Sequence, residues 1–304
     1  MILTNLINGL APIEKKFNDV LINGININSK EVSPGSLFVA IEGHSNDGHS
    51  FVNEAFKNGA SAVISEKHQA SEINKPQIIV NDTRKAVSII SSRFYDNPSK
   101  ELVIIGVTGT NGKTTTSYII KECLSQAGLK TAQIGTTGVI AEGYKQEKTL
   151  TTPDAITLQR LLRNLVKQSF SHVVMEVSSH ALEQFRVHNI DFNIVVFTNL
   201  SEEHLDYHGT MENYFHAKSK LLELLDPKTG LAVINYDDPY GERLLGNTKR
   251  ESIAFSKNNS DVIHFENLNC KDSKIFGSIL TNGIVYDINS QLIGGFNQEN
   301  ILAS

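Results

Sequence analysis

The sequence has 304 residues, of which 40% are hydrophobic and 20% are charged, and its formal net charge is -5. This length predicts about two domains of ordinary globular composition. The mildly acidic charge argues against a nucleic acid partner, and no apolar run approaches the roughly 18 residues of a membrane-spanning helix. The N-terminal segment is interrupted by polar residues and has no basic start. We therefore expect neither a signal peptide nor a membrane anchor, and a cytoplasmic protein.

Residues 1–98 predict a small N-terminal α/β domain. The pattern indicates strands at 37–41, 62–64 and 77–80 and helices at 52–58 and 83–95. The loop at 42–49 contains two glycines and two histidines, and its sequence fits either a plain turn or a ligand-binding loop. Because the last helix runs into Asn97-Pro98, we place the domain boundary there, with a second domain over 99–304.

A glycine-rich loop follows the first strand of the second domain. Residues 102–105 form an apolar, β-branched run, and a loop ending in Gly112-Lys113 comes before a helical pattern. In such a loop, backbone N–H groups close around phosphate oxygens, the lysine reaches the β- and γ-phosphates, and the Thr114 hydroxyl holds Mg²⁺. The strict pattern has a glycine where Val107 stands, so an ordinary glycine-rich turn is the alternative. We predict a nucleoside triphosphate site.

The helix after this loop is predicted to end at Gly128, because a glycine in the left-handed conformation closes many helices. Its apolar face is expected to include Cys123. Cys123 and Cys270 lie far apart in the sequence, so we expect a buried free thiol rather than a disulfide.

Residues 131–135 predict the next strand, and the segment Thr151-Thr152-Pro153-Asp154 after it has the composition of a helix start. Thr152 is the expected N-cap, Pro153 suits the first turn, and Asp154 is favourable near the helix dipole. Thr151 is left as a polar residue near the helix N-terminus, a place that suits an anionic ligand.

Residues 172–177 predict a central strand with a single acid, Glu176, among apolar residues. In phosphate-loop proteins the strand beside the loop strand often ends in an acid that orders Mg²⁺. Glu176 fits this role, and the alternative is a strand-end glutamate that faces solvent. Ser178 follows at the carboxyl edge of the sheet, where open α/β sheets bind ligands.

A lysine, Lys218, lies on the apolar stripe of the helix predicted over 211–225, with Thr210 as its N-cap. This helix follows a strand at 194–197 and a loop at 202–209 that holds two histidines and three acids. Lys218 either extends its stem over apolar surface with the ammonium in water, or is held near the phosphate site. In the second case burial lowers its pKa, and the neutral amine can react with CO₂ to give a carbamate that binds Mg²⁺.

The rest of the chain predicts a strand at 231–235, short antiparallel strands over 250–292, and the start of a helix over 294–304. The predicted fold class is α/β. A small N-terminal α/β domain is followed by a phosphate-loop domain with a mostly parallel sheet flanked by helices.

These motifs together resemble the Mur ligase family, and within it most closely the tripeptide-forming, MurE-type synthetases. The similarity runs through nearly the whole chain and rests on residues 108–115, 151–153, 175–182, 197–201, 204–209, 217–218 and 296–300, with Arg186. The strings at 151–153 and 176–180 are more specific than the glycine loop.

The resemblance implies an ATP-dependent amide ligase of peptidoglycan precursor synthesis, with ATP and Mg²⁺ as its cofactors. The free carboxylate of UDP-N-acetylmuramoyl-L-Ala-D-Glu would attack the γ-phosphate of ATP to give an acyl phosphate. The amine of a diamino acid would then displace phosphate. We expect a monomer with no nucleic acid partner and no membrane insertion.

The family's residue roles are carried over by motif. The expected catalytic residues are Lys113, Glu176, His204 and Lys218. The expected metal ligands are Thr114, Glu176, His204 and Lys218, the last as a carbamate. The expected ATP-binding residues are Gly109, Thr110, Asn111, Gly112, Lys113, Thr114, Thr115, Asn199, Asn297 and Asn300. The expected residues for the UDP-linked peptide are Ser29, His44, Ser45, Asn46, Thr151, Thr152, Ser178 and Arg186.

The family also has a third, C-terminal domain that selects the amino acid, and the sequence stops before it. We therefore expect a chain that lacks this domain, has an incomplete central domain and is inactive by itself. Two alternatives remain. One is another acyl-phosphate ligase of the superfamily, such as a folylpolyglutamate synthetase or a sibling Mur ligase, and the other is a nucleotide-binding module without turnover.

Overall fold

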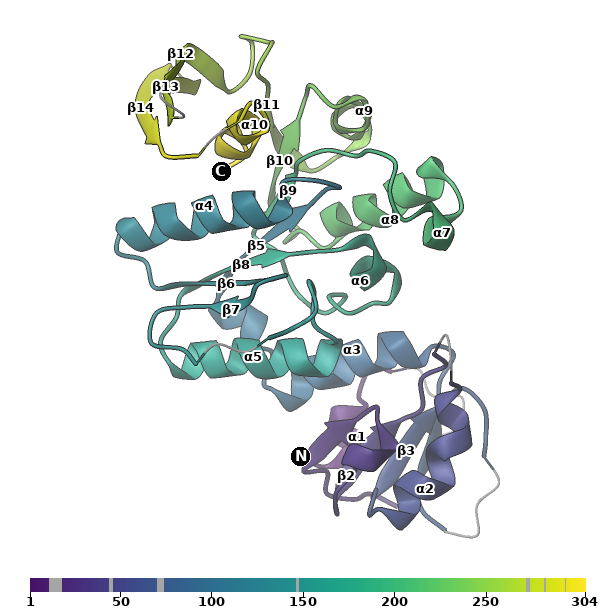
Figure 1. Ribbon diagram of the computed structural model, residues 1–304. Helices are drawn as coiled ribbons and strands as arrows, with labels where there is room; N and C mark the ends of the chain where they lie inside the picture. The colour runs from purple at the N-terminus through teal and green to yellow at the C-terminus, as the bar shows by residue number, and fades with distance from the viewer. Residues whose placement is uncertain are drawn as a thin grey trace. The chain divides into compact units, whose positions relative to one another are not determined.

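The computed structural model describes residues 1–10, 18–43, 46–69, 74–145, 148–271, 274–281, 283–292 and 294–304. The chain forms two compact units, shown in Figure 1. The first contains Met1–Pro98 together with Asp154–Arg163 and Gln184–Asn189. The second contains Ser99–Pro153, Asn164–Glu183 and Ile190–Ser304. Two short segments from the middle of the sequence thus group with the first unit.

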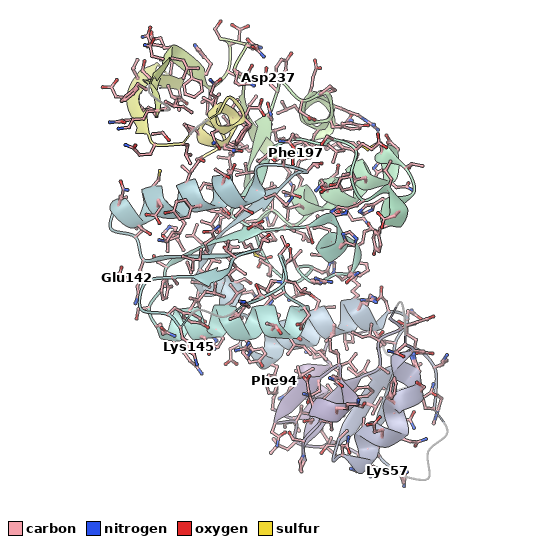
Figure 2. All side chains as sticks on the ribbon, in the orientation of Figure 1. Lys57, Phe94, Glu142, Lys145, Phe197 and Asp237 are labelled. Atoms are coloured by element: carbon pink, nitrogen blue, oxygen red, sulfur yellow. The ribbon has the colours of Figure 1, made fainter. Side chains whose placement is uncertain are left out.

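The first unit is built on a parallel four-stranded sheet with the order β1-β2-β3-β4. The strands are β1 (Gly24–Asn26), β2 (Ser36–Val39), β3 (Ala62–Ser65) and β4 (Gln77–Ile79). Its helices are α1 (Leu3–Leu6), α2 (Val52–Lys57) and α3 (Thr83–Phe94), and Figure 2 labels Lys57 and Phe94 at the ends of α2 and α3. The predicted strands and helices are confirmed with small shifts at their ends, whereas β1 was not predicted.

Alternate residues of β2 point into two different cores, as the two-residue period of a strand requires. Leu37 and Val39 belong to the cluster that also contains α1 and α3 residues. Phe38 belongs to a second cluster, with Val52 and Phe56 of α2. Because β2 is buried on both faces, the three residues after Ser36 are all apolar rather than alternating with polar ones.

The second unit is built on a seven-stranded sheet with the order β11-β10-β9-β5-β8-β6-β7. The strands are β5 (Val103–Thr108), β6 (Thr131–Gly135), β7 (Gly138–Ile140), β8 (His172–Glu176), β9 (Ile194–Phe197), β10 (Leu231–Asn235) and β11 (Glu251–Phe255). All neighbours pair in parallel except β7, which runs antiparallel to β6. The mostly parallel sheet is therefore confirmed. The expectation that every strand over 250–292 is antiparallel is wrong for β11, which pairs in parallel with β10.

Helices cover both faces of this sheet (Figure 1). The helices that lie wholly in this unit are α4 (Lys113–Gln126), α6 (Ser179–Glu183), α7 (Leu205–His208), α8 (Met211–Glu223), α9 (Pro239–Asn247) and α10 (Phe296–Leu302), whereas most of α5 (Ala155–Lys167) groups with the first unit. Val107 of β5 faces a cluster with Ile120 of α4. The neighbouring Gly106 faces the other side, where an added Cβ would lie 2.7 Å from Phe192 and 3.5 Å from Leu221 of α8. The α/β fold class is thus confirmed.

Three further strands form a separate antiparallel sheet, as predicted for the late part of the chain. They are β12 (His264–Lys271), β13 (Lys274–Thr281) and β14 (Ile284–Ser290). Helix α10 follows them and confirms the predicted helix near the end of the sequence. No helix in the described part of the chain is both long and apolar enough to cross a membrane.

Two local predictions about helices are wrong. Asp154, not Thr152, caps α5, because its carboxylate accepts hydrogen bonds from the backbone N–H groups of Ile156 and Thr157, both at 3.0 Å. Cys123 is exposed on α4, since the buried side of that helix runs through Thr116, Ser117 and Ile120. The predicted end of α4 is confirmed, because Gly128 has a φ of 83° and follows the C-cap residue.

Candidate active site

The glycine loop between β5 and α4 has a shape that requires two of its glycines. Gly109 has a φ of 149°, and a Cβ placed there would lie 2.0 Å from the hydroxyl oxygen of Thr198. Gly112 has a φ of 86° and precedes the first residue of α4. Val107, which stands where the strict pattern has a glycine, lies inside β5 and is fully buried. The loop therefore starts to turn two residues later than the pattern assumes.

Residues 198–201, which follow β9, hold this loop through hydrogen bonds. The backbone N–H of Thr110 donates to the carbonyl of Asn199 at 2.9 Å, and the N–H of Asn111 donates to the Asn199 side-chain oxygen at 2.9 Å. The Thr198 hydroxyl donates to the carbonyl of Asn111 at 2.6 Å. Asn199 was predicted to lie near ATP. Its side chain is instead bonded to the backbone of the loop, so its direct role in binding stays a prediction.

Lys113, the first residue of α4, folds back over the loop. Its ammonium donates to the carbonyl oxygens of Gly109 at 2.9 Å and Thr110 at 2.8 Å. Burial lowers the pKa of Lys113, an effect that the negative charges of Glu176 and Glu203 oppose. The amine therefore lies in a poorly hydrated place where a phosphate would be attracted strongly.

Glu176 ends β8, the strand next to β5, as predicted. Its side chain is fully buried, so the alternative of a glutamate that faces solvent is wrong, and its role in ordering Mg²⁺ stays a prediction. The carboxylate accepts from the Thr114 hydroxyl at 2.9 Å and from the backbone N–H of Thr136 at 3.0 Å. Gly135 makes room for it, because a Cβ there would lie 2.0 Å from the Glu176 carboxylate oxygen.

Lys218 on α8 is 1% exposed, so it does not extend its ammonium into water. The ammonium donates to the carbonyl of Gly109 at 2.7 Å and lies 4.6 Å from the ring centroid of Tyr214. Burial, and then the nearby charge of Lys113, hold the pKa of Lys218 well below its ordinary value. The structure thus favours the second alternative for this lysine, in which the amine belongs to the phosphate site.

His204 stands at the N-terminus of α7 in the left-handed conformation, with a φ of 56°. Its imidazole lies 3.7 Å from the carboxylate of Glu203, and its ring centroid is 5.0 Å from that of His180. A second histidine of the same loop, His208, is buried and shares a 2.9 Å hydrogen bond with the Ser179 hydroxyl. The loop at 202–209, which contains both histidines, therefore lies beside the glycine loop.

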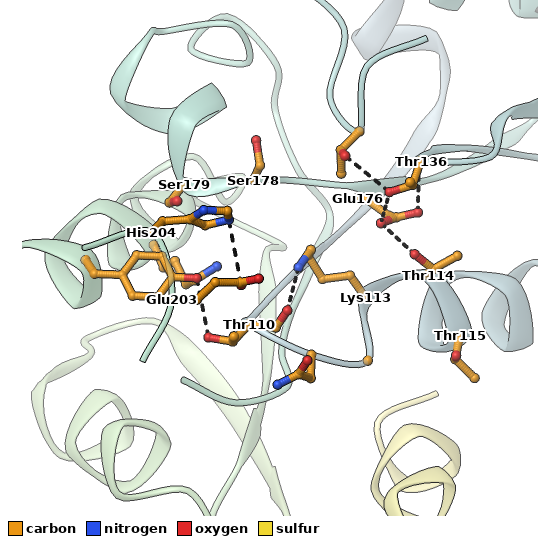
Figure 3. A pocket seen from close by; sticks show the side chains of 15 residues that line it. Thr110, Lys113, Thr114, Thr115, Thr136, Glu176, Ser178, Ser179, Glu203 and His204 are labelled. Atoms are coloured by element: carbon orange, nitrogen blue, oxygen red, sulfur yellow. Dashed lines mark hydrogen bonds and ion pairs between the residues drawn. The ribbon is translucent and has the colours of Figure 1, made fainter. Parts of the chain in front are cut away.

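These side chains line one cavity of about 270 Å³ within the second unit (Figure 3). All four predicted catalytic residues contribute to it: Lys113, Glu176, His204 and Lys218. Four lining residues were not predicted: Thr136, Ser179, Glu203 and Tyr214. Tyr214 lies on the same helical stripe as Lys218 and could have been found from that spacing, whereas Thr136 gives no local signal.

The predicted substrate residues of the second unit lie at the same place. Thr151 and Ser178 line the cavity, and the Thr151 hydroxyl is 3.2 Å from that of Thr136. Thr152 is fully buried and has a structural role. Its hydroxyl donates to the carbonyl of Glu176 at 2.9 Å and accepts from the N–H of Ser178 at 3.0 Å. It therefore fixes the end of β8.

The other predicted substrate residues belong to the first unit. Ser29 is buried and donates to the carboxylate of Glu54 at 3.1 Å. Asn46 is exposed, and Arg186 donates to the side-chain oxygen of Gln184 at 2.7 and 3.1 Å. The remaining two, His44 and Ser45, lie outside the described residues. All of these assignments stay predictions.

Asn297 and Asn300 are buried on α10, and Asn300 contacts the start of α4. Asn300 accepts from the Thr116 hydroxyl at 3.3 Å and donates to the side-chain oxygen of Asn297 at 2.9 Å. A Cβ on Gly112 would lie 2.3 Å from the side-chain oxygen of Asn300. These two asparagines thus support the glycine loop from the side of α10.

The oxygen donors at the N-terminus of α4 fit a magnesium ion. Magnesium prefers oxygen ligands and is bound in proteins through one or two carboxylates together with substrate phosphates. The Thr114 hydroxyl and the Glu176 carboxylate, 2.9 Å apart, supply two such oxygens. Within the described ranges, no three His, Cys, Asp or Glu side chains gather as a metal cluster. A metal ion held here would therefore take further ligands from a bound phosphate.

Comparison with known proteins points to one family. The model of the Mur ligase middle domain matches residues 107–304, and the model of the Mur ligase family, catalytic domain, matches residues 21–95. The UDP-N-acetylmuramoyl-L-alanyl-D-glutamate–2,6-diaminopimelate ligase of Aquifex aeolicus is 43% identical over 283 residues, or 93% of this chain. The Bacillus licheniformis protein of the same name is 38% identical over 290 residues, also 93% of this chain.

A solved structure of a ligase with this name superposes with a TM-score of 0.85 and 30% identity, over 100% of this chain. The chain spans 58% of the Aquifex aeolicus protein, 59% of the Bacillus licheniformis protein and 62% of the chain in that solved structure. The middle-domain match, which covers well over half of the residues, shows that the chain belongs to the Mur ligase family.

Proposed function

We propose that this chain is the nucleotide-binding part of an ATP-dependent amide ligase that acts in peptidoglycan precursor synthesis. The acceptor would be UDP-N-acetylmuramoyl-L-Ala-D-Glu, and the added amino acid would be 2,6-diaminopimelate, as in the names of the relatives. The observation that carries the proposal is the single cavity at the glycine loop that Lys113, Glu176, His204 and Lys218 line together.

The reaction needs a site that gathers positive charge around a phosphoryl group. Lys113 and the N-terminus of α4 would bind the β- and γ-phosphates of ATP. Bound Mg²⁺, held by Thr114 and Glu176, would supply further charge neutralisation, and a second ion would use His204 and a carbamate on Lys218. Thr151 and Ser178 would present the substrate carboxylate to the γ-phosphate, and Thr152 would hold Ser178 in place.

The environment of Lys218 supports its modification. A carbamate forms only from a neutral amine, and burial beside another lysine favours the neutral form. The modification would also replace a buried positive charge by an oxygen ligand for a metal ion.

The first unit would bind the UDP part of the acceptor through Ser29 and the loop around Asn46, with Arg186 holding the peptide. Residues 1–98 would then be the UDP-binding domain and residues 99–304 the ATP-binding domain. A cytoplasmic location and a monomeric state remain part of this proposal.

Release of ADP by the full-length enzyme tests the proposal. We expect release only when UDP-N-acetylmuramoyl-L-Ala-D-Glu and 2,6-diaminopimelate are both present. Lys113→Met should lower the rate by about 100-fold or more, because it removes a phosphate contact. Lys121→Met is the matched control on the same helix and should leave the rate unchanged. Turnover with a folate and glutamate, and none with the muramoyl dipeptide, would contradict the proposal and favour a folylpolyglutamate synthetase.

A further inference from the structure

The turn after β10 holds a carboxylate that serves two elements at once. Asp238 is the N-cap of α9, and one of its oxygens accepts from the backbone N–H groups of Tyr240 at 2.9 Å and Gly241 at 3.1 Å. Its other oxygen accepts from the N–H of Leu200 at 3.0 Å. A helix cap needs only the first set of bonds, so the second requires another explanation.

Leu200 lies in the middle of the segment that holds the glycine loop. On one side of it, Asn199 accepts from the N–H groups of Thr110 and Asn111, both at 2.9 Å. On the other side, the N–H of Ser201 donates to the Thr110 hydroxyl at 3.0 Å. A shift of Leu200 would therefore displace both attachments of the loop.

The start of the same segment is held from β10 as well. The buried side chain of Asn235 donates to the carbonyl of Thr198 at 2.8 Å. Asn235 and Asp238 thus hold the segment 198–201 at two points, Thr198 and Leu200, from one short stretch of chain. This stretch begins at the end of β10 and includes Asp237, labelled in Figure 2.

Burial distinguishes Asp238 from an ordinary capping residue. Burial raises the pKa of Asp238 even though three backbone N–H groups favour its charged form. Asp226, in the turn before β10, also accepts two backbone N–H bonds, from Lys228 and Thr229, and these bonds lower its pKa. Partial removal of a carboxylate from water is unfavourable, so the half-buried position of Asp238 is consistent with a requirement beyond capping.

We propose that Asp238 is a positioning residue for the phosphate-binding loop, acting through Leu200 and the segment 198–201. It would hold the glycine loop in the shape that receives the triphosphate before the nucleotide arrives. This inference rests on the proposed function, because it assumes that ATP binds at the glycine loop.

The test separates the two roles of the carboxylate. Asp238→Ser retains a good helix cap but is too short to reach Leu200. We expect its dissociation constant for the magnesium complex of a non-hydrolysable ATP analogue to rise by about tenfold or more, as for other residues that orient a site. Its affinity for UDP-N-acetylmuramoyl-L-Ala-D-Glu should stay within about twofold of the unmodified protein.

Asp226→Ser is the matched control, since it removes a comparable set of turn bonds without touching the segment 198–201. It should leave both affinities unchanged. Hydrogen exchange gives a second measurement that does not depend on ATP. In Asp238→Ser, the amides of Thr110 and Asn111 should exchange faster while those in the middle of α9 keep their protection.

Unchanged nucleotide affinity with unchanged exchange at Thr110 and Asn111 would overturn the inference. So would an equal loss of affinity for both substrates, because that result indicates general unfolding. If Asp238→Ser is unstable, Asp238→Asn is measured in the same way. Asparagine also caps helices, and with its oxygen used for the cap it presents to Leu200 an NH₂ group, which cannot accept from the Leu200 N–H. If the unmodified protein does not bind the ATP analogue at all, the proposed function fails, and the exchange result still decides the role of Asp238.

Discussion

The ammonium groups of Lys113 and Lys218 share one acceptor, the carbonyl oxygen of Gly109, at 2.9 and 2.7 Å. Lys113 follows the glycine loop in the sequence, whereas Lys218 comes from α8, more than 100 residues later, and both line the same cavity. Two positive charges held this close destabilise each other, and a bound polyphosphate would relieve that repulsion. The pair therefore marks the place where negative charge is expected.

A pH dependence of stability follows from the lowered pKa of Lys218. In the unfolded chain this lysine titrates near 10.5, whereas in the folded protein it releases its proton well below that pH. The unfolded state then binds more protons, so stability rises with pH across the interval between the two pKa values. We expect Lys218→Met to be more stable than the unmodified protein near neutral pH.

This advantage of Lys218→Met should shrink as the pH rises toward 10.5, because the buried amine no longer has to lose a proton on folding. Thermal unfolding in bicarbonate-free buffers measures the difference. A difference that stays constant over this range would show that the folded protein keeps the ordinary pKa of lysine.

Magnesium dependence tests Glu176. Glu176→Gln preserves the size of the side chain and an acceptor for the N–H of Thr136, so the fold should persist. Loss of the charge should weaken nucleotide binding by about tenfold or more when Mg²⁺ is present. Binding in the presence of EDTA should be unaffected. Calorimetric titration under both conditions gives the answer, and an equal loss with and without Mg²⁺ would indicate a structural effect instead.

Gly109 should tolerate no side chain. Gly109→Ala combines a left-handed φ with a Cβ 2.0 Å from the Thr198 hydroxyl, so the unfolding free energy should fall by about 1–3 kcal/mol. Nucleotide affinity should fall with it, because the loop must move. Gly246→Ala is the control. It lies in α9 with open space around it and should raise the unfolding free energy by about 0.5–1 kcal/mol.

The cap of α5 is tested by Asp154→Ala. Removing its two bonds to the N–H groups of Ile156 and Thr157 should lower the unfolding free energy by about 0.5–2 kcal/mol. Denaturant titration measures the change. Asp154→Asn should recover most of the loss, because asparagine caps equally well. An unchanged unfolding free energy in Asp154→Ala would contradict a stabilising role for this cap.

The parts of this fold that could be predicted from the sequence are those with a dense local signal. β5, β8, β9 and β10 are buried in a parallel sheet, and each contains a run of apolar residues, whereas β6 is buried with the polar residues Thr131 and Gln133 in it. Lys218 also gave a strong signal, because a lysine on an apolar stripe is unusual and has few explanations.

Other features depend on partners far away in the sequence. The Thr-Thr-Pro-Asp segment contains several residues that can cap a helix. The Thr152 hydroxyl bonds to the end of β8, so Asp154 is left to cap α5. The sequence of β11 gives no sign of the direction in which the strand pairs. Its parallel pairing with β10 is visible only in the structure. Asn199 was predicted to lie near ATP, but its hydrogen bond to the backbone of Asn111 could be found only in the structure.

The most direct measurement of the central claim is a crystal structure of this protein with a non-hydrolysable ATP analogue and Mn²⁺ in place of Mg²⁺. The account predicts the terminal phosphate within hydrogen-bond distance of the Lys113 ammonium. It also predicts anomalous density for a metal ion between that phosphate and the oxygens of Thr114 and Glu176. A triphosphate bound away from the glycine loop, or a metal ion that does not contact Glu176, would contradict it.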